Sequence, residues 1–259
     1  MLAGGVLDSE FYKMATSQGN TLSIAGVEDY PIEITNGVRI DRKDIRCEHE
    51  EADPIIAQMA ILASLNNESV LTITEDTDVF SIVLHFYVTH ECKHPMYMKS
   101  PKSHMSVKNT YEDCTVIDIK ETAKKHHEIA KYILQIHALT GADCIPALFR
   151  IGKKRALNTL TCFNNESKSK TSSGFFNLEI LAPVGDISAD INDVLAAGSQ
   201  FLIGCYGKTY ATSCKTMTEA RIKMWRKKIS AGPVKLCEIP PTNESSGENI
   251  KRSHYQVAH

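Results

Sequence analysis

A short β-branched run that ends in a group of acids constrains the fold of this chain more than any other segment. Residues 70–74 (VLTIT) are apolar or β-branched throughout, which is typical of a strand that is buried in a parallel sheet. A second apolar run, 79–89, follows directly and has the length of a helix, and a helical stripe of apolar residues also begins at Ala52. Buried strands that alternate with helices predict an α/β fold with a mainly parallel sheet.

The remaining segments fit this pattern with a more helical second half. Short strands are expected at 22–26, 31–35 and 37–40, the last two joined by Asn36-Gly37, a pair that favours a tight hairpin turn. Residues 91–113 are expected to form a loop. Further helices are expected at 118–138, at 153–160, between 178 and 202 with a break near 183–185, and from Thr216, where Ile222, Trp225 and Ile229 share one side.

These elements predict four regions. They are a poorly ordered N-terminus (1–20), an α/β core with an N-terminal hairpin (21–165), a mostly helical C-terminal extension (166–232) and an extended polar tail (233–259).

The composition of the chain indicates where the protein is located and which partners it lacks. Hydrophobic residues make up 42% of the chain and charged residues 23%, as in ordinary globular proteins, and no apolar run approaches the roughly 20 residues that span a membrane. The first residues have no basic or apolar leader segment, and the eight cysteines form no C-x-x-C pair. We therefore expect an intracellular protein, nuclear or cytoplasmic, that has no membrane partner.

The charges are unevenly distributed along the chain. Residues 1–90 contain 15 acids and 5 Lys or Arg, a net charge of −10, whereas residues 91–259 have a net charge of +8. This asymmetry fits two solvated faces of opposite sign, or an acidic site together with a surface that meets a polyanion.

Three acidic motifs lie beside the ends of expected elements. In Glu51-Ala52-Asp53 the two carboxylates converge only if the helix begins at Pro54, and taken alone this motif is better explained by Asp53 as a helix cap. Asp76 and Asp78 follow the 70–74 strand and project to the same side of an extended segment, where two carboxylates favour Mg²⁺ or Mn²⁺; a polar turn that caps the next helix is the alternative.

The third motif is Gly141-Ala142-Asp143, in which Asp143 by itself fits an ordinary turn residue. It precedes a basic segment that starts a helix, Gly152, Lys153, Lys154 and Arg155. Backbone N–H groups and cations in this arrangement can hold a phosphate, although a solvated helix face explains the same cations.

In this order and spacing the motifs resemble the PIN-like nucleases of the flap-endonuclease type, in particular their transposon-associated branch. The resemblance covers about residues 48–225. It is carried by HEEADPIIAQMA (49–60), VLTITEDTDVFSIVLHF (70–86), HALTGADCIPALFRIGKKRAL (137–157) and, less sharply, TEARIKMW (218–225).

The resemblance implies a three-layer domain in which acids at one edge of a parallel sheet bind two Mg²⁺ or Mn²⁺ ions and hydrolyse phosphodiesters. Glu51 and Asp53 match the family's E-A-[ED] ligands, Asp76 and Asp78 match its D-x-D, and Asp143 matches the acid of its G-x-D. The segment from Gly152 to Arg155 resembles the family's helical hairpin, which grips the backbone of a duplex.

These matches predict a structure-specific, metal-dependent nuclease whose partner is nucleic acid, with DNA favoured over RNA. A module that binds nucleic acid or protein without catalysis is the alternative. The family's first acid lies on a strand upstream of the E-A-[ED] motif, but the fifty residues before Glu51 have the pattern of a hairpin. We therefore expect the N-terminal part of the family domain to be missing.

Overall fold

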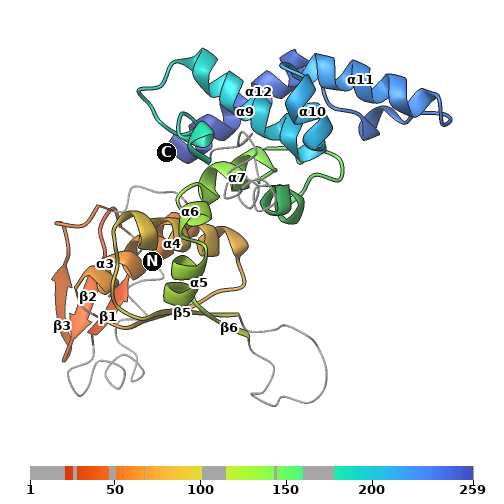
Figure 1. Ribbon diagram of the computed structural model, residues 1–259. Coiled ribbons are helices and arrows are strands. Elements are labelled where there is room, and N and C mark those ends of the chain that lie inside the picture. The colour runs from red at the N-terminus through yellow and green to blue at the C-terminus, as the bar shows by residue number, and fades with distance from the viewer. Residues whose placement is uncertain are drawn as a thin grey trace. The chain divides into compact units, whose positions relative to one another are not determined.

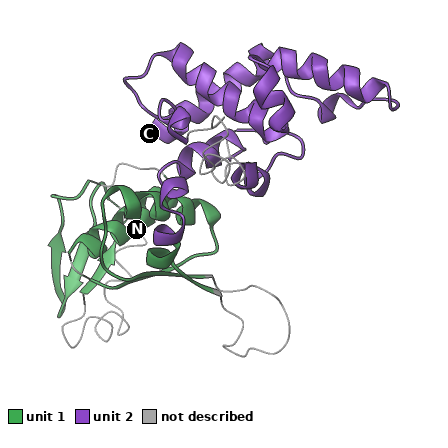
Figure 2. Ribbon diagram, viewed as in Figure 1, with its two compact units in different colours: residues 1–122 green, residues 123–259 purple. Residues whose placement is uncertain are grey.

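The computed structural model describes residues 21–25, 28–46, 51–66, 68–100, 115–142, 145–159 and 178–258. The chain divides into two compact units, Met1–Thr122 and Ala123–His259 (Figures 1 and 2). The expected poorly ordered N-terminus and the expected division at 165/166 both lie outside the described residues.

The first unit contains a three-stranded antiparallel sheet, formed by β1 (Thr21–Ile24), β2 (Ile32–Thr35) and β3 (Val38–Asp41). Asn36 and Gly37 connect β2 and β3 with φ values of 51° and 77°, which confirms the expected tight hairpin turn. Ile32 and Ile34 are buried on one face of this sheet, and the side chains of β1 cover them. All three expected N-terminal strands are therefore confirmed.

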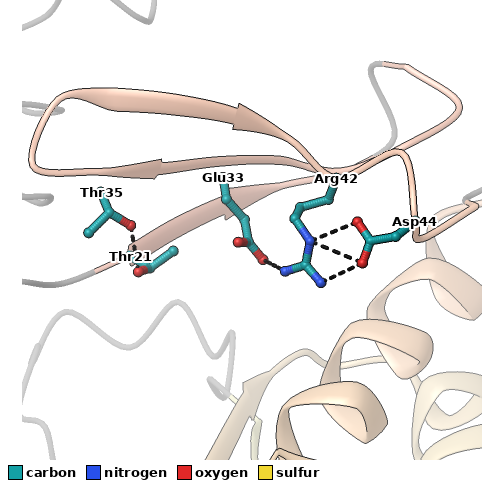
Figure 3. Close-up of polar contacts among 5 residues, drawn as sticks. All are labelled: Thr21, Glu33, Thr35, Arg42 and Asp44. Atoms are coloured by element: carbon teal, nitrogen blue, oxygen red, sulfur yellow. Dashed lines mark hydrogen bonds and ion pairs between the residues drawn. The ribbon is translucent and has the colours of Figure 1, made fainter.

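The other face of this sheet is held by polar contacts (Figure 3). The Arg42 guanidinium donates to Glu33 of β2 at 2.7 Å and to Asp44 at 2.8 Å, so one cation joins a strand to the segment that follows β3. Thr21 of β1 and Thr35 of β2 share a hydrogen bond of 2.7 Å. The hydrogen bond from Arg42 holds the pKa of the Asp44 carboxyl below its ordinary value.

A pH dependence follows from this lowered pKa. The Arg42–Asp44 pair contributes fully to the stability of the folded chain above about pH 4, the ordinary carboxyl pKa. This contribution is lost as pH falls through the lowered pKa of Asp44. We expect the Asp44 carboxyl carbon, followed by NMR, to titrate below the ordinary aspartate pKa and to return to the ordinary value in Arg42→Gln. An unchanged midpoint in Arg42→Gln would contradict the assigned cause.

The second sheet of this unit is small and mixed. The elements run in the order α3 (Ala52–Leu65), β4 (Val70–Ile73), α4 (Thr77–Thr89), β5 (Met96–Ser100) and β6 (Thr115–Asp118). β4 and β5 pair in parallel, but β6 pairs with β5 antiparallel. The expected three-layer domain around a mainly parallel central sheet is therefore wrong for the described residues, which form two three-stranded sheets, one antiparallel and one mixed.

Burial explains why the sequence misleads about this sheet. Thr72 of β4 and Met96 and Met98 of β5 are buried, whereas Leu71 and Ile73 of β4 are 54% and 64% exposed. A strand of a central parallel sheet is covered on both faces, so apolar residues in succession predict that arrangement. Here the same apolar run has one covered face and one exposed face.

The second unit is mainly helical in its described residues. Helix α5 (Ile119–Lys125) crosses the division between the units, and the expected long helix 118–138 is in fact three short ones. The others are α6 (His127–Ala130), α7 (Ile133–Leu139), an unlabelled helix at 153–159, η3 (Leu178–Leu181), α9 (Ile191–Tyr206), α10 (Lys208–Ser213), α11 (Met217–Ile229), η4 (Leu236–Glu238) and α12 (Asn243–Ala258).

The core of the second unit lies where α7, α9 and α12 meet. Ile136, Phe201 and Ile250, one from each of these helices, are almost completely buried. A Cβ on Gly198 of α9 would lie 2.7 Å from Cγ2 of Ile250, so α9 and α12 pack closely because position 198 has no side chain. The expected extended tail at 233–259 is therefore largely a helix, α12, that contributes to the core.

None of the helices described is both long and apolar enough to cross a membrane.

Candidate functional site

The four acids that precede residue 90 in the candidate site lie at the starts of two helices. Helix α3 packs against both β4 and α4, and only four residues connect it to β4. Three residues connect β4 to α4. Because α3 packs against β4 and reaches it through a short link, α3 runs back along the strand, and its first turn lies toward the carboxyl end of β4, where α4 begins.

Asp76 is the last residue of the turn between β4 and α4, and Asp78 lies in the first turn of α4. The expected extended segment through Asp78 is therefore wrong. Asp76 is the N-cap of α4, and its Oδ1 accepts a hydrogen bond of 2.7 Å from the backbone N–H of Asp78. The Thr77 hydroxyl donates to Oδ1 of Asp78 at 3.3 Å. The structure thus shows the helix-capping role for Asp76. A carboxylate has about four lone-pair positions, so this cap leaves oxygen positions on Asp76 for a cation.

Thr74 is a residue of this turn that sequence reasoning missed. Its hydroxyl accepts a hydrogen bond of 3.1 Å from the backbone N–H of Asp76 and so fixes the chain just before the cap. The tendency of threonine to accept from the N–H two residues later is the pattern that could have revealed it.

The helix that contains Asp53 begins two residues earlier than expected. Helix α3 begins at Ala52 rather than at Pro54, which makes the exposed Glu51 the N-cap and puts Asp53 inside the first turn. Glu51 has an extended backbone (φ −95°, ψ 146°) and makes no side-chain cap hydrogen bond. The explanation that Asp53 caps the helix is therefore wrong, and so is the start at Pro54 that convergence of the two carboxylates required.

The acids do not form a closed metal site in the part of the chain that the structure describes. In those ranges no three His, Cys, Asp or Glu side chains come together in a way that could hold a metal ion. Asp143 lies outside the described residues. The clustering of Glu51, Asp53, Asp76, Asp78 and Asp143 around one cavity therefore stays a prediction.

The candidate phosphate-binding segment lies in the second unit. Gly152 precedes the 153–159 helix, and a Cβ added to it would meet no atom within 4 Å. Lys154 is exposed and Lys153 is half-buried. Arg155 donates from Nε to the carbonyl oxygen of Cys205 at 2.9 Å, which ties this helix to α9.

Arg155 therefore has a structural role that the sequence did not indicate. The buried Cys205, whose carbonyl accepts its hydrogen bond, lies in the core of the unit, where burial raises the pKa of the thiol to about 12. Lys154, which is exposed, is the cation of this segment that is best placed to meet a phosphate.

Comparison with protein-family models, with curated proteins and with solved structures finds no match to this chain. Any function must therefore be argued from the arrangement of its own residues.

Proposed function

We propose that the chain is a divalent-metal-dependent nuclease that hydrolyses phosphodiester bonds. The observation that carries the proposal is the position of Asp76 and Asp78 at the start of α4, directly after β4 and toward the same end of β4 as Glu51 and Asp53 at the start of α3. Ligands bind preferentially at the carboxyl ends of strands in α/β proteins. The resemblance of the acidic motifs to those of flap-endonuclease-type enzymes supports the same function.

The donor set of this site fits hard divalent cations. All four side chains offer carboxylate oxygens, which Mg²⁺ and Mn²⁺ prefer, and none offers a soft sulfur ligand. Such ions supply a water of lowered pKa as the nucleophile and neutralise the leaving oxygen. On this proposal the chain's acids orient the ions, and Lys153 and Lys154 position the phosphate backbone without reading bases.

The test is a cleavage assay on end-labelled single-stranded, duplex, flap and RNA substrates. We expect products in Mg²⁺ or Mn²⁺ and none after EDTA is added. Binding of these substrates without cleavage in either metal would overturn the nuclease proposal.

One observation favours a second candidate, a nucleic-acid-binding module without catalysis. Asp76 already serves as a helix cap, so its presence after β4 has a structural explanation that needs no metal. The module predicts binding that is equal in EDTA and in Mn²⁺, whereas the nuclease predicts cleavage that depends on the ion. The same assay therefore separates the two candidates.

Replacing Lys153 and Lys154 with alanine is expected to weaken duplex binding about equally for unrelated sequences. Each lost phosphate contact lowers the slope of log K against log salt by about 0.9, so the double variant should lower it by up to about 1.8. Fluorescence anisotropy across a salt series measures this slope. Lys124→Ala/Lys125→Ala, which removes two cations from the last turn of α5, is the control. An identical slope for wild type and Lys153→Ala/Lys154→Ala would refute the assigned contact.

A further inference from the structure

Helix α11 exposes apolar side chains on the side that faces away from its own unit. Met217, Ala220 and Met224 are its buried residues. On another side Ile222, Trp225 and Ile229 are 44%, 44% and 51% exposed, and we call these three residues the α11 stripe. The expectation that they share one side of a helix agrees with their spacing, but that side points to solvent rather than into the core.

The spacing of the stripe is that of a helix-packing seam. Its residues are separated by three and then four positions, so they follow one another along two turns of a single helix face. The C-terminal half of α11 extends past the other labelled helices of its unit (Figure 1), which leaves room for a partner along its length. A second helix laid on such a seam buries apolar side chains at the same three-and-four spacing.

The charges beside the stripe specify the partner. Helix α11 carries five cations and one acid, Glu219. Three of the cations are engaged within the unit: Arg221 donates to the carbonyl oxygen of Pro240 at 2.5 Å, Lys223 donates to the Ser213 hydroxyl at 2.6 Å, and Lys228 pairs with Glu238 at 2.7 Å. Arg226, which adjoins the stripe, and Lys227 are both exposed. A partner that covers the stripe therefore meets positive charge at its flanks.

The segment after α11 is tied back to this helix. The Lys228–Glu238 pair holds η4 beside the C-terminal half of α11, and this cation lowers the pKa of the Glu238 carboxyl. Leu236 of η4 is 72% exposed. The pair therefore keeps a fourth apolar side chain in the segment that returns beside α11.

We propose that the α11 stripe binds an acidic amphipathic helix of a partner protein, with apolar residues at heptad spacing and glutamate or aspartate on both flanks. This interaction is independent of the proposed nuclease activity. A second copy of α11 is a poor occupant, because two stripes with the same cationic flank would bring like charges together. Single-stranded nucleic acid and anionic membranes also attract cations, and the experiment below distinguishes them.

Trp225 makes the test direct because it is the only tryptophan of the chain. The probe is a designed 21-residue peptide without Trp or Tyr, with leucine at heptad positions a and d and glutamate at e and g, titrated at about 150 mM salt. We expect a saturable blue shift of the tryptophan emission, since the partner helix removes Trp225 from water. The Ile222→Ser/Ile229→Ser variant should weaken this binding at least tenfold.

The control variant is Ile187→Ser/Ile191→Ser, which removes two isoleucines of the same unit that are 73% and 43% exposed, and it should bind the peptide as wild type does. Both variants alter exposed side chains, so both should melt within a few degrees of wild type. An equal response to a peptide with lysine in place of glutamate would overturn the proposal. So would a shift produced by a dT20 oligonucleotide or by phosphatidylserine vesicles but not by the acidic peptide.

Discussion

The variant Asp76→Asn/Asp78→Asn is expected to lose metal-dependent cleavage by roughly 10²–10³-fold, the range found when one charge-stabilising group is removed from an active site. Asparagine keeps the shape of both side chains but removes the two negative charges that attract a divalent cation. Because asparagine caps helices about as well as aspartate does, the melting temperature without metal should change little. Single-turnover cleavage in Mn²⁺ measures the loss.

The chain contains a matched control for this variant. Asp190 caps α9 as Asp76 caps α4, since its carboxylate accepts from the backbone N–H two residues later at 2.7 Å, and Asp193 lies in the first turn. Asp190→Asn/Asp193→Asn therefore makes the same change at a helix start outside the candidate site. Equal losses of cleavage in the two double variants would mean that the effect comes from helix capping and not from the proposed metal site.

Replacing Gly141 with alanine is expected to destabilise the second unit by roughly 2–6 kcal/mol, the sum of backbone strain and overpacking. Gly141 has φ of +111°, which residues with a side chain rarely adopt. A Cβ there would also lie 2.7 Å from Cβ and 2.8 Å from Cα of Ala147. Because the backbone of Ala147 cannot move aside as a flexible side chain would, relief requires the backbones at Gly141 and Ala147 to move apart. Urea denaturation followed by circular dichroism measures the change.

Gly152→Ala is the control for Gly141→Ala. Its added Cβ would meet nothing within 4 Å, so its stability should stay within about 0.5 kcal/mol of wild type. Equal stability of the two alanine variants would contradict the assigned strain at Gly141. Gly152→Ala also tests the proposed phosphate contact, since a methyl group there would hinder close approach of a phosphate and weaken duplex binding without unfolding the chain.

The sequence predicts best where the determinant is local. Asn36 and Gly37 specify a hairpin turn by their own tolerance of positive φ, and the structure has that turn. The start of the expected helix at Asp118 is local in the same way, because the Asp118 carboxylate accepts from the backbone N–H of Glu121 at 2.9 Å. In both cases the interacting groups lie within four residues of each other.

Prediction fails where pairing over distance decides the outcome. The apolar run that forms β4 predicts a parallel sheet that is covered on both faces. Whether β4 is covered on both faces depends on what packs against Leu71 and Ile73, and these two side chains are exposed. Strand β5 was missed because Met96 and Met98 carry its buried face, and methionine indicates no particular secondary structure. Neither fact can be deduced from the segment alone.

Helix α12 was missed because its buried face is largely polar. Its three buried residues are Ser246, Ile250 and Ser253, so hydropathy shows one apolar position instead of a stripe. Both serine hydroxyls donate hydrogen bonds to backbone carbonyl oxygens of the preceding turn. Ser246 donates to Thr242 at 2.8 Å, and Ser253 donates to Asn249 at 3.0 Å. Small side chains of this kind allow α12 to approach its neighbours closely.

The sequence identifies residues of the candidate site but does not predict their geometry. The motifs identify acids beside β4, but the two-residue shift in the start of α3 depends on how the backbone enters the helix, which the acids themselves do not determine. The role of Arg155 depends on Cys205, fifty residues away along the chain. A contact over that distance cannot be inferred from one sequence.

The central claim is that the acids at the starts of α3 and α4 bind one divalent metal centre. The most direct test is a Mn²⁺ titration followed by amide NMR, because the paramagnetic ion broadens the signals of nearby N–H groups. The amides of residues 51–53 and 76–78 are expected to broaden first and together, and Asp76→Asn/Asp78→Asn is expected to abolish this selectivity. Broadening of only one of these two segments, or selective broadening elsewhere in the chain, would contradict the claim.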